Sequence, residues 1–214
     1  MKPTPAQLRT LRRRDPALAR VMPQLPPYPG FPDAMQHRYR SHFHALARAI
    51  LFQQIAGSAA RAILKRVCAL TPGPHFPKAP ELLALSDAKL RGAGLSVNKV
   101  AALRDLAAHV VDGRLRLRGA ASLGDDEIIE RLVQVRGIGL WTAQMFLMFR
   151  IGRLDVMPAT DLAVQEGLRR LDGLAERPTP TAALARAAVW APLRSVGAWF
   201  MWRLSDVDEA TAEG

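Results

Sequence analysis

The sequence predicts an all-α fold. Along most of the 214-residue chain, apolar residues recur at intervals of three and four, and the periodic segments are separated by cap residues, prolines and glycines. No segment alternates between apolar and polar residues over the length of a strand, and no internal repeat is visible. Hydrophobic residues make up 49% of the chain, which favours a packed globular protein over a disordered one.

The N-terminal part predicts a short basic helix at 6–21 and an irregular, proline-rich strap at 25–32. Residues 42–69 predict two helices, because apolar residues fall on one face of each segment. A short corner at 55–58 separates these helices. At this corner Ser58 is the expected cap of the second helix.

The middle of the chain predicts three short helices between residues 80 and 113. Ser86 and Asp87 stand where the second of them should begin, and glycines follow its end. Three acids at 125–127 then open a helix that runs toward residue 135, where they favour the positive end of the helix dipole. After residue 161, apolar periodicity predicts further helices, one of them beginning near Pro192.

The turn Arg136-Gly137-Ile138-Gly139 separates the helix that ends at 132–135 from one that begins at Leu140. Glycines permit backbone angles that other residues resist, and they allow close approach to a bulky group. The first N–H groups of a helix lack partners within it and attract anions, so this hairpin suits a nucleic-acid phosphate. An ordinary corner between two helices explains the same residues, and the hairpin alone leaves both interpretations open.

Asp161 stands one loop beyond the hairpin, just before an apolar-periodic segment that begins at Leu162. Taken alone, it is best interpreted as the cap of that helix, a role that Thr160 could also fill. Its position shortly after an anion-binding hairpin favours a second role, in chemistry on a nucleic acid.

Composition limits the classes of protein. Lysine and arginine number 30 against 19 acidic residues, a net charge of +11, which favours a polyanionic partner, although an arginine-rich composition can also reflect genomic base content. A single cysteine, Cys68, excludes an intrachain disulfide and an iron–sulfur cluster, and the five histidines show no ligand spacing with acids, so no side-chain metal site is expected. No apolar run is long enough to span a membrane, and no secretion signal is visible, so we expect a cytoplasmic, nucleoid-associated protein.

The segment LVQVRGIGLWTAQMFLMF at 132–149, followed by DVMPATD at 155–161, resembles the helix–hairpin–helix/Gly-Pro-Asp superfamily of DNA base-excision glycosylases. The branch it is most similar to is that of 3-methyladenine DNA glycosylase II, over residues 43–202. The resemblance implies two helical domains with a substrate cleft between them. Residues 1–42 plus 155–214 would form one domain, and residues 43–154, with the hairpin motif at about 132–150, the other.

The resemblance also implies the site residues. Asp161 falls on the catalytic aspartate of the family, and Trp141, Met145 and Trp202 fall on positions that line the base pocket. Family members carry an aromatic residue where this chain has Met145. Gln54 falls on the side chain that fills the gap left by the extruded base, where many relatives carry an apolar wedge. The other expected DNA contacts are Gln53, Lys99, Arg136, Gly137, Ile138, Gly139 and Thr142.

Bifunctional relatives carry a nucleophilic lysine at the position of Trp141, and this chain has no lysine after Lys99. It is therefore expected to be monofunctional, without AP-lyase activity. No cofactor is expected to be required, but family hairpins often bind Na⁺ or K⁺ through backbone carbonyls. Here these would be the carbonyls of Val133, Val135 and Ile138.

These observations predict a monofunctional DNA N-glycosylase that flips out N-alkylated purines and excises them by hydrolysis, leaving an abasic site. The expected partner is double-stranded DNA with damaged bases, and the protein is expected to act as a monomer without a membrane. Two alternatives stay open: a glycosylase for deaminated or oxidised purines, and a non-catalytic DNA-binding module that uses the hairpin to hold phosphates.

Overall fold

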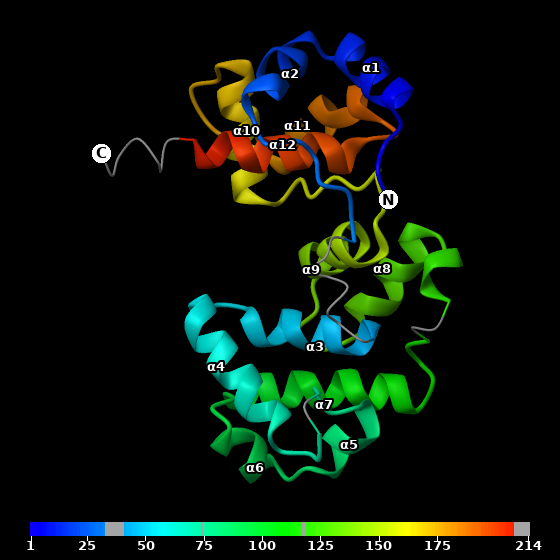
Figure 1. Ribbon diagram of the computed structural model, residues 1–214, viewed down its shortest axis with the longest axis vertical. Helices are drawn as coiled ribbons and strands as arrows, with labels where there is room; N and C mark the ends of the chain where they lie inside the picture. The colour runs from blue at the N-terminus through cyan, green and yellow to red at the C-terminus, as the bar shows by residue number, and fades with distance from the viewer. Residues whose placement is uncertain (33–40, 74, 117–118, 208–214) are drawn as a thin grey trace. The chain divides into compact units, whose positions relative to one another are not determined.

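The computed structural model describes residues 1–32, 41–73, 75–116 and 119–207, and every regular element in these ranges is helical (Figure 1). The all-α prediction is therefore confirmed. The chain divides into a terminal unit, residues 1–33 and 147–214, and a central unit, residues 34–146. The first boundary falls after residue 33 rather than after residue 42 as predicted, and the second falls after residue 146 rather than after residue 154.

The chain passes from the central to the terminal unit where helix α9 ends and a π-helix begins, at Phe146. Residues 147–154 belong to the terminal unit because they pack on its proline-rich strap. The Phe149 and Phe31 rings meet edge to face with centroids 4.6 Å apart, and Gly152, with a φ of +85°, lies against the backbone of Phe31. A side chain at residue 152 would overlap that backbone.

The terminal unit holds helices from both ends of the chain. Its elements are α1 (Pro5–Arg14), α2 (Pro16–Val21), η1 (Met22–Gln24), the π-helix η4 (Phe146–Ile151), α10 (Leu162–Asp172), α11 (Pro180–Arg186), η5 (Ala187–Trp190) and α12 (Arg194–Asp206). The helix predicted at 6–21 is thus two helices. They are divided at Pro16, which has no N–H to continue the α1 ladder and instead opens α2.

A buried carboxylate joins the two chain ends of this unit. Asp15 is 3% exposed; it caps α2 by accepting from the Leu18 N–H at 3.0 Å and accepts from Trp190 Nε1 at 2.6 Å. Arg186 lies 2.8 Å from Asp15 and also binds Asp172 through two contacts of 2.7 and 3.0 Å. Burial alone would raise the pKa of Asp15, but its hydrogen bonds, led by that from Arg186, outweigh burial and hold the pKa below its ordinary value.

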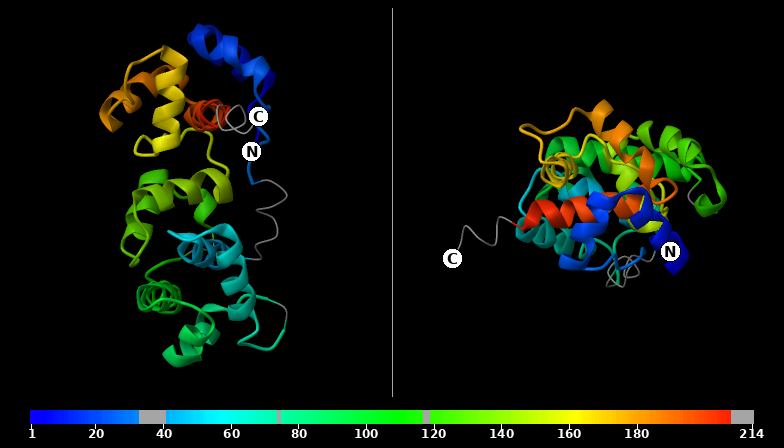
Figure 2. Two further views of the ribbon diagram at one scale, coloured as in Figure 1. Left: turned by 90° about the vertical axis from the view of Figure 1, so that its left-hand side faces the viewer. Right: turned by 90° about the horizontal axis from the view of Figure 1, so that it is seen from above.

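Helices α10 and α12 lie side by side in the terminal unit (Figures 1 and 2). Gly167, in the middle of α10, lies directly against the backbone of Met201 in α12, where there is no room for a Cβ. The absent side chain therefore sets the spacing of the two helices. In the same unit, Gly197 of α12 lies against the ring of Trp190, again without room for a side chain.

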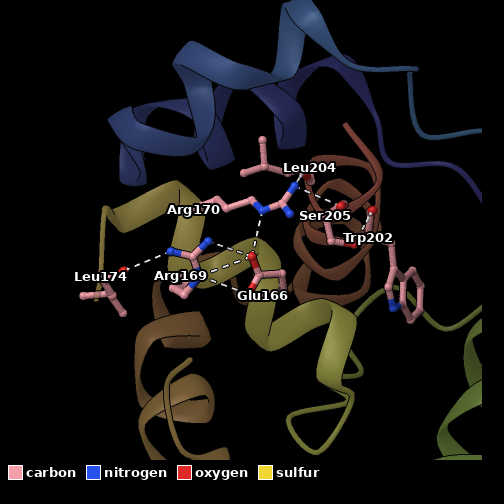
Figure 3. Close-up of polar contacts among 7 residues, drawn as sticks. All are labelled: Glu166, Arg169, Arg170, Leu174, Trp202, Leu204 and Ser205. Carbon is pink, nitrogen blue, oxygen red and sulfur yellow. Dashed lines mark hydrogen bonds and ion pairs between the residues drawn. The ribbon is translucent and has the colours of Figure 1, made fainter. Parts of the chain in front are cut away.

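Figure 3 shows the polar contacts that hold the same two helices near the end of α12. Glu166 accepts from Arg169 and Arg170, each at 2.8 Å, and these hydrogen bonds, chiefly that from Arg169, lower the pKa of Glu166 to about 2. Arg170 also donates to the carbonyls of Leu204 and Ser205, both at 2.9 Å. Since these carbonyls lie in the last turn of α12, the arginine links α10 to the helix end that carries Trp202 (Figure 3).

The central unit contains α3 (His42–Phe52), α4 (Gly57–Cys68), α5 (Ala79–Ala84), α6 (Asp87–Gly92), α7 (Val97–Val111), η3 (Ala120–Ser122), α8 (Asp125–Val133) and α9 (Leu140–Met145). The three short helices predicted between 80 and 113 are α5, α6 and α7. Helix α7 packs against both α3 and α5, and the contacts bury Leu46, Ile50, Leu82, Leu103 and Leu106 to 1% exposure or less.

The predicted cap of α4 is wrong. Helix α4 begins at Gly57, Ala56 stands at the cap position, and the helix has no side-chain cap. Ser58 lies inside the first turn because the corner closes one residue earlier than its sequence suggests. Within the described part of the chain, no helix is long and apolar enough to cross a membrane.

Replacing Gly167 with alanine should destabilise the protein, although alanine is the better helix former. The new Cβ would overlap the Met201 backbone and push α10 from α12. We expect the free energy of unfolding, measured by urea titration, to fall by about 1–3 kcal/mol, the usual effect of overpacking. Gly92→Ala is the matched control, since a Cβ there meets open space, and it should change the free energy by about 1 kcal/mol or less. Equal stability of the two variants would contradict the steric role of Gly167.

Candidate active site

Asp161 is the N-cap of α10. Its Oδ1 accepts from the backbone N–H groups of Ala163 and Val164, each at 3.0 Å, and from the indole Nε1 of Trp202 at 3.1 Å. The cap role predicted from the sequence is therefore confirmed. Because these three hydrogen bonds converge on one oxygen, the carboxylate has a fixed orientation at the positive end of the helix.

Trp202, the residue that donates to Asp161, is itself held in place by a ring stack. Its indole stacks on Phe149, with ring centroids 5.6 Å apart and planes inclined by 26°. Phe149 in turn meets Phe31 of the strap. The strap, the π-helix and α12 thus position one tryptophan beside the carboxylate, and all three belong to the terminal unit.

The loop before Asp161, Val156-Met157-Pro158-Ala159, is fastened to the start of α12. The Val156 N–H donates to Ser195 Oγ at 2.9 Å, and that hydroxyl donates back to the Val156 carbonyl at 3.2 Å. Arg194 binds Asp155 with two contacts of 2.8 Å, and its hydrogen bond holds the pKa of Asp155 below the ordinary value. The loop therefore carries Asp161 on a rigid support.

The hairpin of the central unit links α8 to α9, as predicted. The Ile138 N–H donates to the Val135 carbonyl at 3.0 Å, and both side chains are buried. Gly137 has a φ of +82°, and an added Cβ would lie 3.1 Å from the Ala102 Cβ of α7, so glycine is required there.

Gly139 does not use the backbone freedom that a glycine permits. Its φ is −92° and its ψ 177°, an extended conformation open to any residue. An added Cβ would meet nothing within 4 Å. The protein itself thus gives no reason for a glycine here, whereas a DNA backbone close to the start of α9 would give one.

Arg136 is anchored to α7 at the edge of the hairpin. Its backbone N–H donates to Asp105 Oδ2 at 2.8 Å, and its guanidinium donates to Asn98 Oδ1 at 3.4 Å. Asp105 was not predicted from the sequence, because its partner lies 31 residues away and no local pattern marks the contact. The exposed Arg136 side chain keeps its charge at the surface beside the hairpin turn.

The first turn of α9 presents large apolar side chains to the surface. Leu140 is 47% exposed and Trp141 is 45% exposed, while Met145 is partly exposed one turn later. Such exposure of an indole, next to the hairpin turn, is unusual for a residue that serves only the core. Thr142 is different, since it is 6% exposed and its hydroxyl accepts from the Gln53 amide at 3.4 Å.

Gln53, Gln54 and Lys99 lie together at the end of α3. Gln53 Nε2 donates to the Gly137 carbonyl at 2.9 Å, which joins this corner to the hairpin. Gln54 is exposed. Lys99 Nζ donates to the carbonyls of Leu51 and Gln53, two contacts within the protein that the sequence did not predict.

The family comparison agrees with this combination of an all-helical fold, a glycine hairpin and a capping aspartate. The family described as HhH-GPD superfamily base excision DNA repair protein matches residues 47–192. The chain belongs to this superfamily.

Individual relatives are similar over most of the chain. DNA-3-methyladenine glycosylase 1 of Schizosaccharomyces pombe is 35% identical over 170 residues, which is 79% of this chain and 75% of the relative. The crystal structure of a DNA-3-methyladenine glycosidase from Bacillus halodurans superimposes with a TM-score of 0.82 at 31% identity, covering 97% of this chain and 92% of that one. The S. pombe 3-methyladenine DNA glycosylase in complex with abasic DNA has a TM-score of 0.75 at 30% identity, covering 93% and 95%.

The cap geometry separates two substitutions of Asp161. Asparagine keeps an oxygen that can accept from Ala163 and Val164, whereas alanine removes the acceptor. We expect Asp161→Ala to lower the free energy of unfolding by about 1 kcal/mol, and Asp161→Asn to lower it by only a few tenths. Thermal and urea unfolding of both variants beside the wild type would measure this. An equal loss for asparagine and alanine would show that the charge, which both substitutions remove, stabilises this helix rather than the cap oxygen.

Proposed function

We propose that this protein is a monofunctional DNA N-glycosylase that excises N-alkylated purines, of the 3-methyladenine and 7-methylguanine type, from double-stranded DNA. The observation that carries the proposal is Asp161, a carboxylate fixed by three hydrogen bonds within a chain of the base-excision superfamily. The names of the relatives in S. pombe and B. halodurans support the substrate class.

The proposed reaction is hydrolysis of the glycosidic bond. The target nucleotide is first flipped from the duplex, at a cost of a few kcal/mol. The bond between the sugar C1′ and the purine N9 then breaks, and its electron pair leaves with the base. Asp161 stabilises the positive charge that develops on the sugar. A water oxygen bonds to C1′ and loses a proton, which leaves an abasic site.

Aromatic side chains suit the recognition of such a base. N-alkylated purines of this type carry a positive charge, and an indole face attracts cations. We assign base contact to Trp141, Met145 and Trp202. Since the leaving base becomes neutral when the bond breaks, the reaction needs no acid to protonate it.

The hairpin is assigned to the DNA backbone. The open space at Gly139 leaves room for a phosphate beside the first N–H groups of α9, and the Arg136 guanidinium lies next to it at the surface. Gln54 is assigned to the gap that the flipped base leaves. These contacts hold the duplex while the base is out of the stack, and most of them do not read sequence.

The hairpin carbonyls also suit a monovalent cation. Val133 is the last residue of α8, where carbonyls lack helical partners, and Val135 and Ile138 belong to the turn that follows. The described residues hold no group of three or more His, Cys, Asp or Glu side chains that could bind a metal instead. We propose that Na⁺ or K⁺ bound by these carbonyls supplies a positive charge for a DNA phosphate.

We further propose that the protein acts as a monomer on nucleoid DNA in the cytoplasm.

The proposal predicts release of methylated purines from methylated duplex DNA by the wild-type protein. Asp161→Asn should lower the single-turnover rate by about 100-fold or more, the size expected for loss of a preorganised charge at the reacting centre. Chromatography of the released bases measures both proteins. Glu176→Gln, which removes an exposed carboxylate of the same unit, is the matched control and should keep the wild-type rate.

Other results would select the alternatives. Binding of methylated DNA without base release would favour the non-catalytic module. Release of hypoxanthine or of an oxidised purine in place of methylated bases would move the specificity to those lesions. Full activity of a folded Asp161→Asn variant would remove this carboxylate from the reaction.

We also expect no strand cleavage at the abasic product. The chain has no lysine after Lys99, and the position of the nucleophile in bifunctional relatives holds Trp141. Incubation with methylated DNA and sodium borohydride should therefore trap no accumulating covalent adduct, whereas a bifunctional glycosylase treated in parallel should give one. An adduct that forms at the rate of base release would contradict the monofunctional assignment.

A further inference from the structure

The corner that follows α3 holds an uncommon backbone conformation. Helix α3 ends at Phe52, Gln53 is its C-cap, and Gln54 has a φ of +56°. Side chains with a Cβ rarely adopt such positive φ values, so neighbouring groups must stabilise the conformation. The Gln54 side chain is exposed at the surface.

Lys99 binds two backbone carbonyls at the end of α3, just before Gln54. From the first turn of α7, its Nζ donates to the Leu51 carbonyl at 2.6 Å and to the Gln53 carbonyl at 2.9 Å, across 48 and 46 residues of sequence. The end of a helix attracts cations because its last carbonyls lack partners. Partial burial of the ammonium lowers the pKa of Lys99, as expected for a charge turned inward.

Gln53 attaches the same corner to the hairpin. Its side-chain nitrogen donates to the Gly137 carbonyl at 2.9 Å and to Thr142 Oγ1 at 3.4 Å. Gln53 therefore connects three elements. Its backbone carbonyl binds Lys99 of α7, and its side-chain amide binds the hairpin. These links belong wholly to the central unit, and the exposed Gln54 is the next residue in the chain.

We propose that Lys99 is a positioning residue for base excision, which acts through Gln54 by fixing the corner at the end of α3. The proposal rests on the proposed function, in which Gln54 fills the gap in the duplex. If the corner is already ordered before DNA binds, the free-energy cost of ordering this loop does not have to be met when the base is flipped. The ammonium serves carbonyls of the protein, so Lys99 contributes geometry rather than a phosphate contact.

The first test uses the protein without DNA. Hydrogen exchange followed by mass spectrometry should show faster exchange at residues 51–57 in Lys99→Met than in the wild type, with α7 and α8 unchanged. Lys99→Arg, which can still donate to both carbonyls, should recover part of the protection. Lys89→Met is the matched control, because it removes an exposed lysine of the same unit and should leave the corner unchanged. Unchanged exchange at the corner in Lys99→Met would overturn the proposal.

The second test separates positioning from phosphate contact. A phosphate contact contributes about 0.9 to the slope of log affinity against log salt, so a positioning residue should leave this slope unchanged in Lys99→Met. The single-turnover rate on methylated DNA should fall by about tenfold, as expected when a group that orders the site is lost. A slope that falls by about 0.9, at an unchanged rate, would overturn the proposal.

A double-mutant cycle tests the route through Gln54. If Lys99 acts through this side chain, Lys99→Met combined with Gln54→Ala should release base about as fast as Gln54→Ala alone. If the two substitutions lower the rate of base release independently, so that their effects multiply in the double mutant, Lys99 has another role and the proposal is overturned. If the wild type releases no methylated base, the proposed function and the role of Lys99 in excision are both wrong. If the wild type is active but the two substitutions lower its rate independently, only the proposed role of Lys99 is wrong.

Discussion

The close approach of α10 and α12 is the constraint on which the terminal unit depends. Gly167 lets α10 touch the backbone of Met201, and the next residue, Trp202, then reaches the Asp161 carboxylate with its indole nitrogen. Any side chain at residue 167 would separate the helices and lengthen that 3.1 Å hydrogen bond. A packing contact among buried groups therefore decides the geometry of a polar site at the helix start, because the spacing of the helices sets the reach of the tryptophan.

The central unit fixes its hairpin and the corner after α3 by other means. There the links are polar: Lys99 and Gln53 bind backbone carbonyls and a hydroxyl that lie 46 to 89 residues away in sequence. A flexible lysine can serve this purpose because its ammonium can donate in several directions at once. The hairpin and the corner after α3 are thus held in one arrangement within the unit, although each is a short turn with little core of its own.

The sequence predicted what local chemistry determines. Helical periodicity, the hairpin glycines and the cap at Asp161 are all short-range signals, and the structure has each of them. Tertiary contacts decided the rest. The partners of Lys99 and Asp105 are distant in sequence, and the unit boundary falls near Phe146 because the residues after it pack on the strap. Of the two reasons that the sequence offers for a glycine at 139, its ordinary φ does not support the need for an unusual backbone angle, which leaves close approach to a bulky group.

The same hydrogen bonds that hold Asp161 also bear on how it acts. Oδ1 accepts from Ala163, Val164 and Trp202, so its lone pairs are directed at these three donors. An oxygen so engaged is poorly placed to take a proton from water, yet its negative charge still acts on a nearby cation. The negative charge of the carboxylate can therefore stabilise a cationic sugar, and Oδ1 is not the oxygen that would take a proton from water. A cationic leaving base makes that role sufficient, because the bond to such a base breaks without an acid and the sugar charge is the remaining barrier.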